Sequence, residues 1–166
     1  MRGLALFAAG TMVGLAVTAG AQSLSPASVS PNHGVVGLNH VGISVPDVDK
    51  AVEYYTKTLG FPEAFRVKNA AGEVQLVYVQ ISKNTFVEIQ PSNAQRPPGI
   101  SHFGVVVDKM PDAVAMFKER GAKVGETNLS ATKAILNNIA DPNGIRMELA
   151  ELPPESLHHQ AMDRWK

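Results

Sequence analysis

The chain contains no cysteine among its 166 residues. This absence excludes disulfide bonds, thiolate metal ligands and a cysteine nucleophile, and also a lipid anchor, which needs a cysteine after the cleavage site. An excess of charge is absent too, because 15 basic and 15 acidic side chains balance to zero and no block of like charge stands out. We therefore expect no nucleic-acid footprint and no polybasic membrane patch. Small-molecule chemistry or protein contact remains as the expected class of function.

Residues 1–21 have the layout of a secretory signal peptide. Met1 and Arg2 give a positively charged start, residues 4–17 are mostly apolar, and small residues at 19–21 suit a signal peptidase. An uncleaved membrane anchor is the weaker interpretation, because the apolar run is short and rich in glycine and alanine. Residues 22–34 are dominated by serine and proline and predict a flexible linker. We expect a mature protein that is free of the membrane and periplasmic or secreted.

An internal repeat organises the rest of the chain. A shift of 62 residues, without gaps, superposes residues 38–58 on 100–120. The shift places His40 on His102 and Gly42 on Gly104, and it also aligns the apolar positions of two amphipathic helices. Each copy then closes on a short apolar stretch that contains one glutamate, Glu88 in the first and Glu148 in the second. Agreement in both residue type and helix face indicates a duplication.

Each copy has the pattern of a strand, a helix and three further strands, which predicts an α+β fold of two tandem βαβββ modules. In the first copy we expect strands at 38–45, 63–68, 73–81 and 85–90 and a helix over 47–59. In the second copy we expect strands at 100–107, 122–126, 133–139 and 144–150 and a helix over 110–120. Residues 95–99 form a stiff linker between the two halves.

Alternation within the strands predicts where the histidines and glutamates point. Val41 and Ile43 share one face of the first strand, so His40 lies on the other face, and Glu88 is placed in the same way on the fourth strand. The second copy repeats this arrangement with His102 and Glu148. The helices are expected on the apolar face, which leaves two imidazoles and two carboxylates in a concavity. Such a set is typical of a divalent-metal site.

The tail, residues 153–166, predicts a short amphipathic helix. Leu157, Ala161 and Trp165 are spaced four residues apart, which suits docking on the body of the protein or on a partner subunit. His158 and His159 are adjacent and must face different directions. We interpret both as surface residues rather than metal ligands.

Three segments resemble the vicinal oxygen chelate (VOC) superfamily, which includes glyoxalase I, methylmalonyl-CoA epimerase, extradiol dioxygenases and bleomycin or fosfomycin resistance proteins. These segments are residues 38–43 (LNHVGI), 54–61 (YYTKTLGF) and 141–149 (DPNGIRMEL). The resemblance implies a glyoxalase-like domain over residues 35–152, with a first module at 36–94 and a second at 99–152. In that fold the sheets of the two modules curve together into an open barrel with a metal at its centre.

The resemblance also implies which residues hold the metal. Ligands in this superfamily come from the first and fourth strands of each module, which are the places of His40, Glu88, His102 and Glu148. Two histidines with two glutamates favour the four-ligand, non-redox branch, although Gln90 lies on the same face as Glu88 and is the alternative fourth ligand. The ligand set fits zinc, nickel, cobalt, manganese or iron without choosing among them.

The chemistry expected of such a site is proton removal next to a carbonyl group. The metal would act as a Lewis acid that stabilises an enediolate of a small oxygen-chelating substrate, with Glu148 or Glu88 as general base. Lyase, isomerase and epimerase reactions follow this scheme. Glutathione and coenzyme A thioesters are principally cytoplasmic, so an exported enzyme is poorly placed to use them.

Two other functions stay open at this point. One is a non-catalytic, resistance-type protein that binds a small molecule, and the other is an extradiol-type dioxygenase that works with three of the ligands. The resemblance further suggests a homodimer, and the sequence leaves open whether the metal would be bound within one chain or across two.

Overall fold

The computed structural model describes residues 34–166, so the predicted signal peptide and nearly all of the predicted linker lie outside the described residues. Eight strands form one sheet in the order β2-β3-β4-β1-β5-β8-β7-β6. The first module contributes β1 (Val35–Val45), β2 (Glu63–Lys68), β3 (Val74–Ser82) and β4 (Thr85–Pro91). The second contributes β5 (Gly99–Val107), β6 (Asn128–Leu129), β7 (Ile135–Ala140) and β8 (Arg146–Glu151). Among residues 34–166, no helix is both long and apolar enough to cross a membrane.

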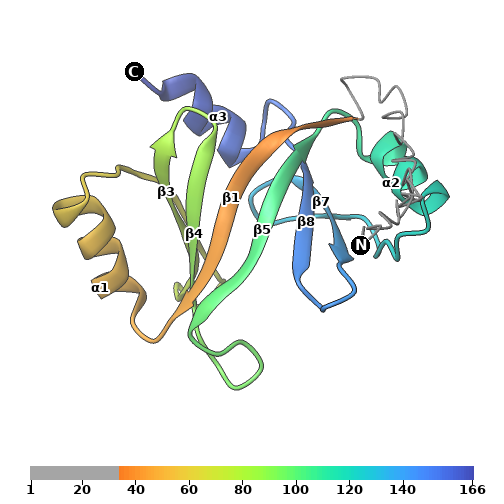
Figure 1. The fold of residues 1–166 in the computed structure, drawn as a ribbon. Coiled ribbons are helices and arrows are strands. Elements are labelled where there is room, and N and C mark those ends of the chain that lie inside the picture. The colour runs from red at the N-terminus through yellow and green to blue at the C-terminus, as the bar shows by residue number, and fades with distance from the viewer. Residues whose placement is uncertain (1–33) are drawn as a thin grey trace, which may run out of the picture.

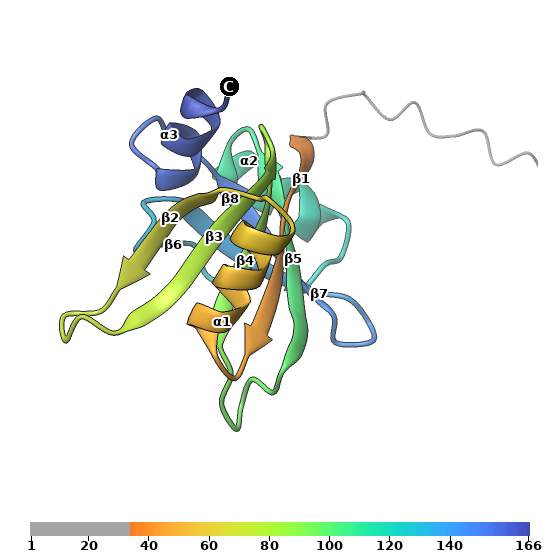
Figure 2. The same ribbon diagram turned by 90° about the vertical axis from the view of Figure 1, so that its left-hand side faces the viewer.

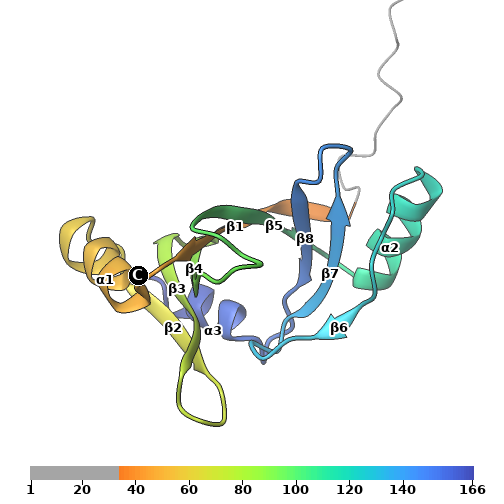
Figure 3. The same ribbon diagram turned by 90° about the horizontal axis from the view of Figure 1, so that it is seen from below.

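The strand order is symmetric about the contact between the two first strands. Each module pairs its first strand with its fourth in parallel, β1 with β4 and β5 with β8. The antiparallel pair β1–β5 then joins the two modules edge to edge. The sheet curves into a half-barrel that is open on one side (Figures 1 and 3). The predicted α+β fold of two βαβββ modules is confirmed.

The helices of the two modules cover the convex face of the sheet. In the first module α1 (Val48–Glu53) begins at Asp47, whose carboxylate accepts a hydrogen bond from the Lys50 N–H, and it continues as the π-helix η1 (Tyr54–Thr58). In the second, α2 (Met110–Glu119) has a proline in its first turn. Figure 2 shows α1 lying against the sheet of its own module. The apolar core of each module therefore lies between one helix and the convex side.

The strand predicted over 122–126 is wrong. In the structure Val124 makes one isolated bridge to Ile139, and the strand β6 comes later and has two residues. The Gly125 N–H donates to the Asn138 carbonyl at 2.8 Å, whereas the Gly125 carbonyl accepts from the side-chain amide of Asn137 at 3.0 Å. The other predicted strands and helices are present with boundaries shifted by at most three residues.

The C-terminal segment forms α3 (Leu157–Arg164), which begins at the buried Ser156, whose hydroxyl accepts from the His159 N–H. Unlike α1 and α2, α3 lies on the concave side of the sheet, inside the curve of the half-barrel (Figure 3). Ala161 is 2% exposed and packs with Tyr78 and Phe86, which project from the concave face. The predicted docking of an amphipathic tail on the body of the protein is thus realised within the chain.

Candidate metal centre

Two histidines face each other across the contact between β1 and β5. In the register of this pair, His40 lies opposite Gly104 and Gly42 lies opposite His102. A Cβ atom added at Gly42 would come within 2.0 Å of the His102 ring, and one added at Gly104 within 2.1 Å of the His40 ring. Each glycine therefore makes room for the imidazole of the other module. The repeated His-X-Gly pattern has this steric cause.

Hydrogen bonds to the outer nitrogens orient both rings. His40 Nδ1 lies 2.9 Å from Asn39 Oδ1, a carbonyl oxygen that can only accept, so Nδ1 carries the proton. His102 Nδ1 lies 2.9 Å from the Ser101 hydroxyl, which already donates to the Gly42 carbonyl at 3.1 Å. His102 Nδ1 therefore donates as well. Both Nε2 atoms keep their lone pairs for a ligand.

The two Nε2 atoms are 3.0 Å apart. With a proton on Nδ1 of each ring, two lone pairs face each other at this distance, and that arrangement is repulsive unless a cation lies between them. Both rings are almost fully buried, with exposed fractions of 0% for His40 and 2% for His102. Water from bulk solvent is therefore poorly placed to relieve the repulsion.

The fourth strands bring the two carboxylates to the same point. Glu88 Oε2 lies 3.4 Å from His40 Nε2 and 3.5 Å from His102 Nε2, and Glu148 Oε1 lies 3.5 Å from His40 Nε2. One ligand atom from each of the four residues lies within 4.8 Å of the others. Gln90, the alternative fourth ligand, lies two residues further along β4, opposite Ser44. All four predicted residues are thus brought together, and within one chain.

These separations fit a divalent ion. Nitrogen and oxygen ligands about 2.0–2.1 Å from a common centre lie roughly 3.0–3.4 Å from one another, depending on the coordination angle. The four separations given above, 3.0 to 3.5 Å, fall in or next to that range, and the remaining pairs of ligand atoms lie within 4.8 Å. The cluster could therefore hold a divalent metal, and imidazole with carboxylate does not single out which one.

The two carboxyl groups lie in different electrostatic surroundings. Burial and the neighbouring Glu88 raise the pKa of Glu148 to about 7, although His102 and Arg146 act to lower it. Burial also acts to raise the pKa of Glu88, but His102, His40 and the Tyr78 hydroxyl stabilise its charge and hold that pKa below its ordinary value. Glu88 is thus the permanently ionised member of the pair.

The sequence analysis did not identify two residues next to the cluster, Tyr78 and Arg146, and it interpreted a third wrongly. The hydroxyl of Tyr78, on β3, donates to Glu88 Oε2. Arg146, on β8, places Nη1 3.5 Å from Glu148 Oε2 and 2.9 Å from Asn138 Oδ1. Tyr78 lies directly opposite Glu88 in the antiparallel pair β3–β4, and Arg146 precedes Glu148 by two residues on the same face. Strand alternation could have found Arg146, whereas Tyr78 required the register between strands.

The third is His158, for which the surface interpretation is wrong. Its side chain is 2% exposed and lies on the concave side, with its ring centroid 6.3 Å from that of His40. Burial and the charge of His40 lower the pKa of His158 to about 3, while Glu88 acts to raise it. Its neighbour His159 is half-buried on the outer side of α3, and the Nδ1 atom of His159 lies 3.1 Å from the Leu152 carbonyl oxygen.

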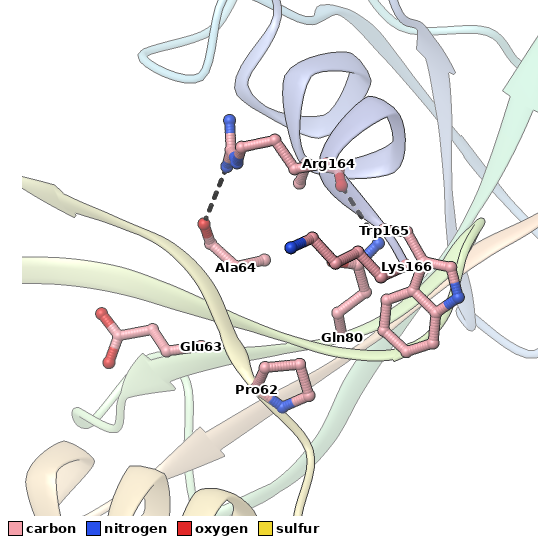
Figure 4. A pocket seen from close by; sticks show the side chains of 8 residues that line it. Pro62, Glu63, Ala64, Gln80, Arg164, Trp165 and Lys166 are labelled. Carbon is pink, nitrogen blue, oxygen red and sulfur yellow. Dashed lines mark hydrogen bonds between the residues drawn. The ribbon is translucent and has the colours of Figure 1, made fainter.

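A separate cavity of ≈ 370 Å³ lies at the other end of α3 (Figure 4). It is bounded by Pro62, Glu63 and Gln80 of the first module and by the last residues of the chain. Figure 4 shows the Arg164 side chain reaching across to the Ala64 carbonyl, a contact of 3.3 Å. This cavity does not include any of the four clustered residues.

A half-barrel of two βαβββ modules with two histidines and two glutamates at its joint defines a candidate metalloprotein of the glyoxalase-like fold. The family model of the Glyoxalase/Bleomycin resistance protein/Dioxygenase superfamily matches residues 39–135, more than half of the chain. The chain belongs to this superfamily, as the resemblance of its motifs predicted.

Individual relatives are more distant. A probable chloroplastic lactoylglutathione lyase of Arabidopsis thaliana is 28% identical over 128 residues, which is 69% of this chain and 35% of the relative. The chain thus spans about a third of the length of that relative. The methylmalonyl-CoA epimerase of Mycobacterium tuberculosis has a TM-score of 0.65 at 23% identity, covering 74% of this chain and 91% of that one. A variant of the Streptomyces coelicolor methylmalonyl-CoA epimerase has a TM-score of 0.64 at 19% identity, covering 74% and 98%. These structures establish the fold.

Proposed function

We propose that this protein is an exported, metal-dependent enzyme of the lyase, isomerase or epimerase type. Its substrate would be a small molecule that chelates the metal through two adjacent oxygens. One observation carries the proposal: two unprotonated Nε2 atoms face each other at 3.0 Å, next to two buried carboxylates. The relatives named lyase and epimerase support the reaction class.

The two carboxylates have different proposed roles. Glu148 is the proposed general base, because its carboxylate lies at the cluster, with Oε1 3.5 Å from His40 Nε2 and Oε2 3.5 Å from Arg146 Nη1. Glu88 stays ionised and is held in place by the Tyr78 hydroxyl, which suits a permanent ligand. Arg146 orients the outer oxygen of Glu148. A bound divalent ion would act as a Lewis acid on the substrate oxygens.

The test separates metal binding from chemistry. Metal content is measured on protein purified without a histidine tag and compared with a His40→Ala/His102→Ala variant. Exchange of the substrate C–H next to a carbonyl with solvent deuterium is then followed by NMR for small 2-oxo and 2-hydroxy acids and aldehydes. We expect about one ion per chain, exchange by the wild type, and at least a hundredfold slower exchange by Glu148→Gln. Equal, substoichiometric metal in both proteins would refute the proposal.

The remaining functions are outcomes of the same experiment. Metal without exchange of any substrate would favour a non-catalytic binding protein. Oxygen consumption with a catechol by the iron-loaded protein, retained in Glu88→Ala, would favour a three-ligand dioxygenase.

Export limits the choice of substrate. The relatives carry glutathione and coenzyme A substrates in their names, whereas the signal-peptide layout of residues 1–21 favours a substrate found outside the cytoplasm. Cell fractionation and sequencing of the mature N-terminus test this part, with cleavage expected after Ala21. A homodimer is also proposed, and light scattering of the mature protein measures it.

A further inference from the structure

The helix α3 is fixed to both modules over the concave face. At its start, the Leu157 N–H donates to the Thr132 carbonyl of the second module at 2.9 Å. Further along, the Gln80 side chain of the first module donates to the Ala161 carbonyl at 3.5 Å. Two attachments on opposite sides of the half-barrel define where the helix lies. The residue on its inner side, His158, is therefore held in a defined position.

The ring of His158 lies among aromatic rings that border the metal centre. Its centroid is 4.5 Å from Tyr78, 4.9 Å from Phe65 and 5.7 Å from Phe86. The Tyr78 hydroxyl in turn donates a hydrogen bond to Glu88. The His158 ring also stacks on the His40 ring, with 6.3 Å between the two centroids. His158 thus contacts one member of the cluster, His40, directly and is linked to a second, Glu88, through Tyr78.

Neither nitrogen of His158 has a hydrogen-bond partner within the described part of the chain. A neutral imidazole offers one donor and one acceptor, and leaving a buried polar group without a partner is strongly unfavourable. A phenyl ring would fill the same aromatic surroundings without this penalty. Ser44, on the same face of β1 as His40, has the other buried side-chain atom that lacks a partner among residues 34–166. Unpartnered groups thus flank the cluster along β1 and from α3.

We propose that His158 is a substrate-binding residue, whose ring hydrogen-bonds an oxygen of the molecule chelated at the metal centre. The inference rests on the proposed function and adds a residue from outside the repeated modules to it. Through α3, the C-terminal tail contributes one residue to the site of the bound molecule. His158 does not belong to the group of four that could hold the ion, so its role concerns the bound molecule.

The experiment uses the cobalt-loaded protein and acetohydroxamate, a small anion that chelates metals through two adjacent oxygens. Cobalt affinity and acetohydroxamate affinity are each measured from the visible spectrum of the ion, and thermal unfolding is recorded alongside. The variants are His158→Phe, His158→Gln and, as a matched control on the outer side of the same helix, His159→Gln. Glutamine at 158 keeps a donor and an acceptor, whereas phenylalanine keeps only the volume.

We expect His158→Phe to bind cobalt as the wild type does, to unfold at the same or a higher temperature, and to bind acetohydroxamate about tenfold or more weakly. His158→Gln should recover part of that loss, and His159→Gln should match the wild type. Equal acetohydroxamate affinity in the wild type and His158→Phe would overturn the inference and leave the metal site intact. Failure of the wild type to bind cobalt would instead overturn the proposed function, and with it this inference.

Discussion

At the residue scale, the glycines opposite the two histidines are as important to the site as the ligands. A side chain at either position would occupy the space of an imidazole ring from the other module. The dependence is reciprocal, because His40 needs Gly104 and His102 needs Gly42. The sequence repeat contains these glycines, but their role follows only from the register of β1 with β5.

Gly42→Ala and Gly104→Ala should each displace the opposing ring. The added Cβ would lie 2.0 or 2.1 Å from it, far inside van der Waals contact, and the ring is held in a rigid strand pair. We expect metal affinity to fall at least a hundredfold and measure it by competition with a chelating dye. Gly37→Ala, on the same strand with nothing within 4 Å of the new Cβ, is the control. Wild-type affinity in Gly42→Ala would contradict the steric argument.

Buried histidines should make the metal-free protein sensitive to acid. Burial lowers the pKa of His40 to about 4 and that of His158 to about 3, so below pH 6.5 the unfolded chain binds protons that the folded chain does not. The stability that these residues provide is therefore present above pH 6.5 and lost as the pH falls toward those values. The contribution of Glu148 to stability changes with pH in the opposite direction. Between pH 7 and the ordinary pKa of glutamate, the folded chain binds a proton on Glu148 that the unfolded chain does not, so a fall in pH over this range stabilises the fold.

The contribution of His158 can be isolated by comparing the wild type with His158→Phe in urea at pH 7, 6 and 5, after removal of metal by a chelator. The variant should gain stability relative to the wild type by about 1.4 kcal/mol per pH unit below pH 6.5, or about 2 kcal/mol at pH 5. Groups that act on His158 from the neighbouring strands are His40 and Glu88. A stability difference that stays constant with pH would show that His158 titrates alike in the folded and unfolded chain.

At the scale of the elements, periodicity predicted most of the fold. Alternation placed the strands and their inward-facing residues, and the four-residue spacing of the tail predicted α3. Two failures have physical causes. The strand over 122–126 is reduced to one isolated bridge at Val124, because the Gly125 carbonyl accepts from the Asn137 side chain and only its N–H bonds the backbone of Asn138. The surface interpretation of His158 was wrong because α3 is a short helix on the concave face of the sheet, where a residue next to its apolar stripe is buried as well.

Docking of α3 can be broken without touching the cluster. Ala161→Arg would place a long charged side chain against Tyr78 and Phe86, where Ala161 is 2% exposed. We expect α3 to detach and trypsin to remove the tail at least tenfold faster, while metal affinity stays within about threefold of the wild type. Gln160→Arg, on the exposed side of α3, is the matched control. Unchanged cleavage in Ala161→Arg would show that α3 does not depend on this contact.

At the scale of the whole molecule, one continuous sheet brings all four clustered residues together within a single chain. The sequence predicted their identity, since each occupies the same place in its module. It left open whether the metal would be bound within one chain or across two, because strand alternation does not determine which strand edges pair. The hydrogen-bond partners Tyr78 and Ser101 likewise depend on pairing between strands that are distant in the sequence.

A site built within one chain should bind metal independently of protein concentration. We expect one ion per chain by calorimetry, with the same affinity across a hundredfold dilution of the protein. Saturation with zinc at 100 times its dissociation constant should stabilise the fold by about 2.7 kcal/mol, and a chelator should reverse this. Half an equivalent of metal, or an affinity that weakens on dilution, would instead indicate a site shared between two subunits.

The antiparallel register of β1 with β5 has a consequence for the ancestry of the protein. Because His40 faces Gly104 while Gly42 faces His102, the β1–β5 pair is close to twofold symmetric around the two histidines. An ancestor with one βαβββ unit could have had this symmetry by pairing with its own copy, bringing two histidines and two glutamates to the shared axis. Gene fusion would then have allowed the two halves to diverge, while the histidine, the glutamate and the glycine are present in both halves.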